Sequence, residues 1–273
     1  MPTFERGPAA IHYTDTGAPA GDPHAATVFF GHGLLFGGWM FRAQVGALRN
    51  RYRCVAIDWR GQGDSAPTSG GHDMDTLTDD ATALIEALGV GPVHFVGLSM
   101  GGFVGQRLAA RRGDLVRTLT LLDTSAGPED PDKARRYRLM ARAYLLTGIS
   151  PLRGAVQPLM FGPEFLGDPR SKPVLDEWAA RLRRCRRSAT SKAVLAVADR
   201  DGIETEIPGI TAPTLVIVGA DDVATPPAKS RRIVELIEGA RLVQIPNCGH
   251  SSSVEQPDAV SALLADFLDG QAD

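Results

Sequence analysis

Short, mostly apolar runs recur along the chain, and each ends at a glycine, an aspartate or a proline. They occupy residues 28–30, 54–57, 93–96, 119–122, 215–218 and 242–245. Strands that are buried on both faces of a parallel sheet have continuous apolar, β-branched sequences, without strict alternation. The runs therefore predict the strands of a buried, mostly parallel sheet.

Helical periodicity fills several of the intervals between these runs. Residues 77–88 place Leu77, Ala81, Leu84 and Ile85 on one stripe, and Gly89 follows as a C-terminal stop. Strands that alternate with helices predict an α/β fold with a doubly wound sheet. Such sheets bind ligands beyond the carboxyl ends of their strands.

One long stretch, between residues 127 and 212, departs from this alternation. It has helical segments but no convincing strand, and prolines punctuate it. Because a structureless loop of this length is improbable, we expect a helical cap at residues 128–212, with a core formed by residues 1–127 and 213–273. Five arginines between residues 181 and 187 predict a solvated helix face; recognition of an anionic substrate is the alternative.

Composition narrows the class of protein. The 273 residues carry a net charge of −3, with 43% hydrophobic and 22% charged residues. This balance gives no electrostatic case for binding nucleic acid or an anionic membrane. We find no signal-peptide h-region and no apolar run near the roughly 20 residues of a membrane span.

The three cysteines, Cys54, Cys185 and Cys248, are odd in number and far apart. Their spacing matches neither a disulfide framework nor a metal site. We therefore expect a reducing, cytoplasmic setting and no metal or other cofactor.

A candidate nucleophile follows the run at residues 93–96. The segment 97–101 reads Gly-Leu-Ser-Met-Gly, which matches G-x-S-x-G between a strand and a helix, the context of a nucleophile elbow. Glycines two positions before and after Ser99 avoid clashes in a sharp turn, and Gly102 and Gly105 let the helix approach the sheet. A helix N-cap serine is the structural alternative.

An alcohol needs a base at neutral pH. Of six histidines, His250 lies in the loop after the last apolar run, which is the right place for a general base. His12 and His94 lie in strand-like runs and fit structural roles, whereas His24 and His72 lie in polar loops.

The base in turn needs a carboxylate that orients its ring. Asp222 follows the run at residues 215–218 and is the favoured candidate, with Asp221 and Asp123 as alternatives. The order serine, aspartate, histidine is that of the hydrolase fold.

Developing charge on a carbonyl oxygen requires preorganised N–H groups. The backbone N–H groups of Met100 and Leu34 are the candidates, because Met100 follows the serine and glycines precede Leu34. We expect His32 to buttress this loop and to take no part in proton transfer. Leu34, Leu35 and Trp39 are candidates for an apolar substrate pocket.

Taken together, these segments resemble the α/β-hydrolase superfamily. The matching pieces are 32–33, 58–65, 97–102, 219–222 and 249–250. The resemblance implies the serine, aspartate and histidine roles given above; it selects Asp222 as the acid and makes residues 58–65 a structural turn. Residues 218–227 are similar to 3-oxoadipate enol-lactonases and small carboxylesterases, and a serine nucleophile argues against haloalkane dehalogenases and epoxide hydrolases.

We therefore expect a cofactor-free hydrolase of a small-molecule carboxylic ester or lactone, acting through an acyl-enzyme. The alternatives are carbon–carbon bond hydrolysis, perhydrolase activity of the cofactor-free haloperoxidase type, and a non-enzymatic ligand-binding relative. No nucleic-acid or membrane partner is expected, and a homo-oligomer stays open.

Overall fold

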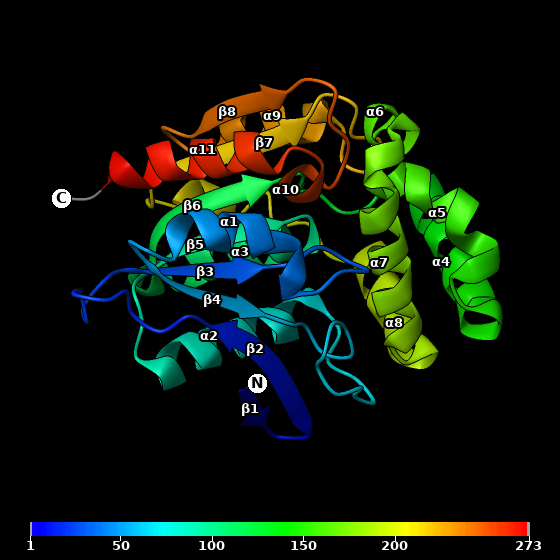
Figure 1. Ribbon diagram of the computed structural model, residues 1–273, viewed down its shortest axis with the longest axis horizontal. Helices are drawn as coiled ribbons and strands as arrows, with labels where there is room; N and C mark the ends of the chain where they lie inside the picture. The colour runs from blue at the N-terminus through cyan, green and yellow to red at the C-terminus, as the bar shows by residue number, and fades with distance from the viewer. Residues whose placement is uncertain (1, 272–273) are drawn as a thin grey trace.

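A central sheet organises the computed structural model, which describes residues 2–271 (Figure 1). Within these residues, eight strands form one sheet in the order β1-β2-β4-β3-β5-β6-β7-β8. They are β1 (Thr3–Arg6), β2 (Ala9–Asp15), β3 (Thr27–Gly31), β4 (Arg53–Ile57), β5 (Val93–Leu98), β6 (Val116–Leu122), β7 (Thr214–Gly219) and β8 (Arg241–Ile245). Neighbours from β4 to β8 pair in parallel, whereas β2 pairs antiparallel with β1 and β4. The predicted mostly parallel sheet is confirmed.

Helices cover both faces of the sheet. They are α1 (Arg42–Leu48), α2 (Met74–Leu88), α3 (Met100–Arg111), α4 (Pro131–Thr147), α5 (Arg153–Met160), α6 (Pro163–Gly167), α7 (Lys172–Arg184), α8 (Arg187–Ala198), α9 (Pro227–Leu236), α10 (Ser252–Glu255) and α11 (Pro257–Asp269). One core cluster includes buried residues of α2, α3 and α9, and the other includes those of α1 and α11. The sheet is therefore doubly wound.

Helix α2 shows how local sequence sets an element. The Asp73 side chain accepts a hydrogen bond from the Thr76 N–H at 2.8 Å and caps the helix N-terminus. The stripe that includes Leu77 and Leu84 is fully buried, and Gly89 ends the helix in the left-handed conformation, as the pattern predicts.

Helices α4 to α8, called the cap helices below, lie between β6 and β7 in the sequence. Figure 1 shows them together on the side toward which the parallel strands point. Prolines stand in the first turn of α4, α6 and α7, where a missing N–H costs nothing. The cap helices thus adjoin the strand ends at which the sequence places the chemistry.

The helices described above fall short of what a bilayer requires. In the part of the chain that the structure describes, none combines the length and apolar character needed to cross a membrane.

Candidate active site

Ser99 occupies a strained turn between β5 and α3. Its φ of 50° and ψ of −109° lie outside the regions that L-residues favour, a conformation that costs on the order of 1–3 kcal/mol. A Cβ on Gly97 would collide with the backbone of Gly101, and a Cβ on Gly101 would collide with the carbonyl of Gly31. The predicted reason for these glycines is therefore confirmed.

The elbow is held in place by hydrogen bonds to β6 and the loop that follows it. The Ser99 N–H donates to the Leu122 carbonyl at 2.8 Å, and the Thr124 hydroxyl donates to the Ser99 carbonyl at 2.8 Å. A Cβ on Gly102 would lie 2.6 Å from that hydroxyl oxygen, so α3 packs against this loop with no room for a side chain. Both backbone polar groups of Ser99 are therefore engaged while its side chain lines a cavity.

His250 pairs with Asp222. Its Nδ1 lies 2.9 Å from Asp222 Oδ2, and both side chains are buried. The other carboxylate oxygen accepts the N–H groups of Ala224 and Thr225 at 2.8 and 2.9 Å, and the Thr225 hydroxyl donates to Oδ2. Because a carboxylate only accepts, Nδ1 carries the proton and Nε2 is the free acceptor of the neutral ring.

The three candidate acids occupy different environments. Asp222 faces His250, whereas Asp221 is exposed and its N–H donates to the Cys248 carbonyl. Asp123 is fully buried and accepts the Gly219 N–H at 2.8 Å and the Ser252 N–H at 3.2 Å. It therefore bridges the end of β7 and the start of α10, and among the described residues it makes no hydrogen bond to the imidazole.

Burial and neighbouring charges both shift the pKa values of His250 and Asp123. Burial lowers the pKa of His250, but the carboxylate of Asp222 and its hydrogen bond raise it more, so the net pKa lies above 6.5. Burial, reinforced by the nearby charge of Asp222, raises the pKa of Asp123 to about 8.

Ser99 and His250 line the same cavity, called the cap cavity below. It encloses about 800 Å³, including the part open to solvent. Its apolar wall includes Met140, Tyr144, Val156, Met160, Val194 and Val197 from the cap helices α4, α5 and α8. Leu34 and Leu35 line it as well, but Trp39 lies in a second hollow, beside Arg42 and Arg181.

The loop after β3 is fixed from behind by His32. The Trp59 N–H donates to His32 Nε2 at 3.0 Å, and His32 Nδ1 lies 2.7 Å from the Gly33 carbonyl. Burial lowers the pKa of His32, so the ring is neutral and both nitrogens are occupied. The Leu35 N–H donates to Gln62 Oε1 at 3.1 Å. Met100 is the first residue of α3, so its N–H has no acceptor within that helix.

A buried ion pair borders the cap cavity, and the sequence analysis missed it. Glu129 lines the cavity, and its Oε2 lies 3.0 Å from Arg200 Nη1; the two side chains are 6% and 2% exposed. The Arg200 guanidinium lies 4.2 Å from the centre of the Phe103 ring. Burial and the Glu129 charge raise the pKa of Tyr137 to about 12, so its hydroxyl is neutral. No motif marks these residues, because the pair depends on how the cap packs.

Glu255 ties the cap to the histidine loop. Its Oε2 accepts the N–H groups of Gly162 and Gly249, both at 2.9 Å, and its Oε1 accepts the Ser251 N–H at 2.9 Å. A Cβ on Gly162 would lie 2.7 Å from the Gly249 nitrogen, so the two backbones are almost in contact.

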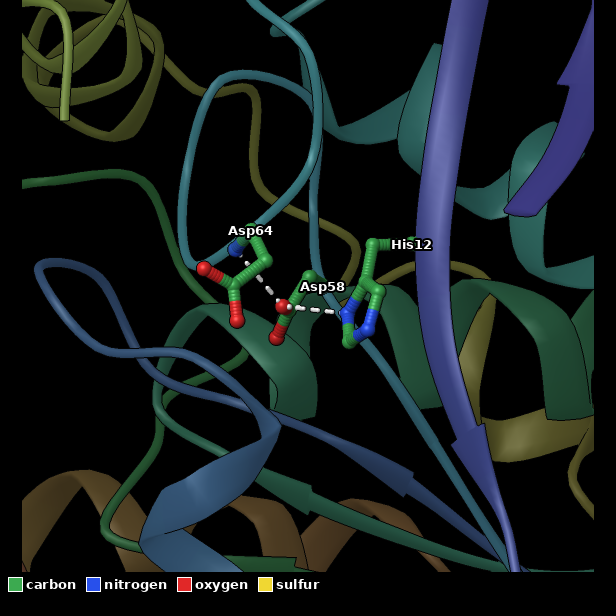
Figure 2. Close-up of side chains that lie close together, drawn as sticks. All are labelled: His12, Asp58 and Asp64. Atoms are coloured by element: carbon green, nitrogen blue, oxygen red, sulfur yellow. Dashed lines mark hydrogen bonds and ion pairs between the residues drawn. The ribbon is translucent and has the colours of Figure 1, made fainter. Parts of the chain in front are cut away.

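His12, Asp58 and Asp64 also lie close together (Figure 2). Asp58 Oδ2 accepts the Asp64 N–H at 2.8 Å and lies 2.9 Å from His12 Nδ1, while Oδ1 accepts the Gly38 N–H at 2.6 Å. The hydrogen bond to Asp58 raises the pKa of His12. Since N–H donors occupy these oxygens and the imidazole favours its proton, the residues fit a structural turn better than a metal site.

Comparisons with known proteins show which family this chain resembles. The model of the alpha/beta hydrolase family matches residues 28–263. The chain is 31% identical to a "Putative non-heme bromoperoxidase BpoC" of Mycobacterium tuberculosis, covering 94% of this chain and 97% of that protein. It is 31% identical to a "Putative carbamate hydrolase RutD" of a Caulobacter species, covering 96% and 97%.

A solved structure adds the same evidence at the level of the fold. The enol-lactonase of Burkholderia xenovorans superposes with a TM-score of 0.89 at 29% identity, covering 98% of this chain and 100% of that one. In this chain the predicted helical insertion before the strand that leads to Asp222 is present as helices α4 to α8, between β6 and β7. The chain belongs to the alpha/beta hydrolase family.

Proposed function

We propose that this hydrolase cleaves a carboxylic ester or lactone through an acyl-enzyme, with Ser99 as nucleophile, His250 as base and Asp222 as the orienting acid. One observation carries the proposal. Ser99, raised on a strained elbow, shares the cap cavity with His250, whose ring is fixed by Asp222 at 2.9 Å. The proposal also includes the location of the protein. The cysteines Cys54, Cys185 and Cys248 are free thiols, which supports a reducing, cytoplasmic setting.

The chemistry proceeds in two halves. Ser99 Oγ attacks the carbonyl carbon while His250 Nε2 takes the hydroxyl proton, and Asp222 stabilises the imidazolium. The N–H groups of Leu34 and Met100 bind the oxyanion. The imidazolium then gives its proton to the leaving oxygen as the C–O bond breaks. Water, deprotonated by His250, attacks the acyl-enzyme and releases the acid and free Ser99.

The cap cavity favours an uncharged, apolar acyl group. Within the described part of the chain, neither lysine nor arginine lines it, and Glu129 adds a carboxylate to its wall. A carboxylated substrate would therefore meet no cation there. In this proposal the cap of residues 128–212 sets the choice of substrate.

A perhydrolase is the second candidate, because a relative at 31% identity is named a non-heme bromoperoxidase. In that reaction hydrogen peroxide replaces water in attacking the acyl-enzyme, and a peracid leaves. Comparing acid and peracid yields from one ester, with and without peroxide, separates the two.

Labelling with a fluorophosphonate probe and assays on uncharged esters test the proposal. We expect Ser99→Ala to abolish labelling and lower kcat by several orders of magnitude. Ser230→Ala is the matched control, because Ser230 is buried in α9, its hydroxyl has no hydrogen-bond partner among the described residues, and it does not line the cap cavity. Near-normal hydrolysis by a folded Ser99→Ala protein would refute the assignment, and a wild-type protein that resists labelling would favour the ligand-binding alternative.

A further inference from the structure

Exposed apolar side chains concentrate on α4. Among the described residues, four large apolar side chains are exposed: Leu139 at 68%, Leu145 at 45%, Leu146 at 78% and Val223 at 52%. The first three belong to α4. The fourth adjoins it, because Lys133 Nζ donates to the Val223 carbonyl at 2.9 Å. Isolated exposed leucines are ordinary, but Leu139 and Leu146, the two most exposed, lie two turns apart on one face of α4.

The same helix is strongly basic. Its 17 residues include Lys133, Arg135, Arg136, Arg138 and Arg142, against one acid, Asp132. Arg187 of α8 adds another cation at the C-terminal end, where it donates to the Leu146 carbonyl at 2.8 Å. The whole chain carries a net charge of −3, whereas this helix concentrates positive charge, of which Asp199 neutralises only Arg138 by pairing with it.

The helical period separates two faces of α4. Steps of three and four residues put Arg135, Arg138, Leu139, Arg142 and Leu146 on one stripe, called the outer stripe below. The opposite side contributes Tyr137, Met140 and Tyr144 to the cap cavity. Figure 1 shows α4 at the rim of the molecule, remote from the sheet. One helix thus forms a cavity wall on one side and a basic, leucine-bearing surface on the other.

We infer that the outer stripe docks on an anionic lipid surface. Arginines that flank exposed leucines are the composition of a helix that lies in a bilayer interface, where cations meet lipid headgroups and leucines enter the acyl boundary. A second copy of this chain fits less well, because a two-fold contact would set the arginines of one stripe against those of the other. The inference is independent of the proposed ester chemistry.

Co-sedimentation of the full chain with vesicles tests the inference. We expect binding to equimolar phosphatidylglycerol and phosphatidylcholine, little binding to phosphatidylcholine alone, and release by salt. Arg135→Gln/Arg142→Gln is expected to lower partitioning by about tenfold or more, and Leu139→Ser/Leu146→Ser to weaken it as well. Arg49→Gln/Arg231→Gln, with the same charge change at exposed sites elsewhere, should bind like the wild type.

Several outcomes would overturn the inference. They are no binding to anionic vesicles, equal binding to both vesicle types, and an equal loss in the Arg49/Arg231 control. Self-association in sedimentation velocity that disappears in Leu139→Ser/Leu146→Ser would assign the stripe to a second copy instead. Circular dichroism establishes that each variant is folded. Hydrolysis of a dissolved ester should be unchanged, since the substituted residues do not line the cap cavity.

Discussion

Replacing Glu129 by alanine would leave the Arg200 guanidinium buried without its counter-charge. Removing one partner of a buried pair typically costs about 3–5 kcal/mol, because the remaining charge stays desolvated. Arg200 would keep hydrogen bonds to the Val197 carbonyl at 2.8 Å and the Ser125 hydroxyl at 3.1 Å, and its contact with Phe103. We therefore expect the lower end of that range, about 3 kcal/mol.

An exposed ion pair supplies the control. Arg111 and Glu206 lie 2.6 Å apart with both side chains 39% exposed. Exposed pairs contribute about 0.2–1 kcal/mol, so Glu206→Ala should cost much less than Glu129→Ala. Urea unfolding followed by circular dichroism gives the free energy of unfolding of each protein.

A second variant tests whether the loss comes from the orphaned charge. Arg200→Met removes the cation as well, so Glu129→Ala/Arg200→Met should lose less stability than the two single changes added together. If Glu129→Ala and Glu206→Ala cost the same within about 0.5 kcal/mol, the reasoning from burial fails.

Three further predictions concern the site. The pKa of His250 lies above 6.5 and the base must be neutral, so kcat/KM should fall at acid pH with an apparent pKa above 6.5. Asp222→Asn should move this acid limb of the pH profile to lower pH and reduce kcat. An acid limb that does not move would contradict the pairing of His250 with Asp222. Gly101→Ala should destabilise the fold by about 3 kcal/mol or more, because the new methyl group meets the carbonyl of Gly31. Gly46→Ala is the control and should not destabilise the fold, because the space around Gly46 is open. Similar melting temperatures for both variants would contradict the close contact between Gly101 and Gly31. Burial raises the pKa of Asp123 from 3.8 to about 8, so the protonated carboxyl stabilises the fold, and this stability is lost as the pH rises from 3.8 toward 8. The melting temperature of Asp123→Asn should therefore depend less on pH over this range than that of the wild type. Parallel plots of melting temperature against pH for the two proteins would contradict the prediction.

The sheet was predictable where strands are buried on both faces. The runs that became β3 to β7 are mostly apolar, because neither face of these central strands meets water. The run that became β8 lies at one edge of the sheet and is only partly buried. Strand β1 was missed, since it pairs along one edge only and its residues alternate between exposed and intermediate burial. An edge strand of four residues leaves too short a pattern to recognise.

The elbow and the histidine loop were predictable because the residues that shape each turn are neighbours in the sequence. Glu129 was not predictable, since its burial depends on where the cap helices place Arg200. The arginines between residues 181 and 187 were expected to be solvated. Four of the five are exposed, as expected, whereas Arg181 is half-buried. It pairs with Glu177 at 2.9 Å and lies 5.0 Å from the centre of the Trp39 ring. The net charge of the whole chain likewise gave no sign of the basic α4, because acidic residues elsewhere cancel the positive charges of this helix in the sum.

The carboxylate of Glu255 accepts hydrogen bonds both from the cap, at Gly162, and from the loop that carries His250, at Gly249 and Ser251. An outward movement of the segment around Gly162 would break the hydrogen bond from the Gly162 N–H to Glu255. The same carboxylate holds the residues on either side of His250 through their N–H groups. Any hinge at that segment would therefore loosen the imidazole as it admitted a molecule. Closure of this corner thus keeps the His250 ring beside Asp222.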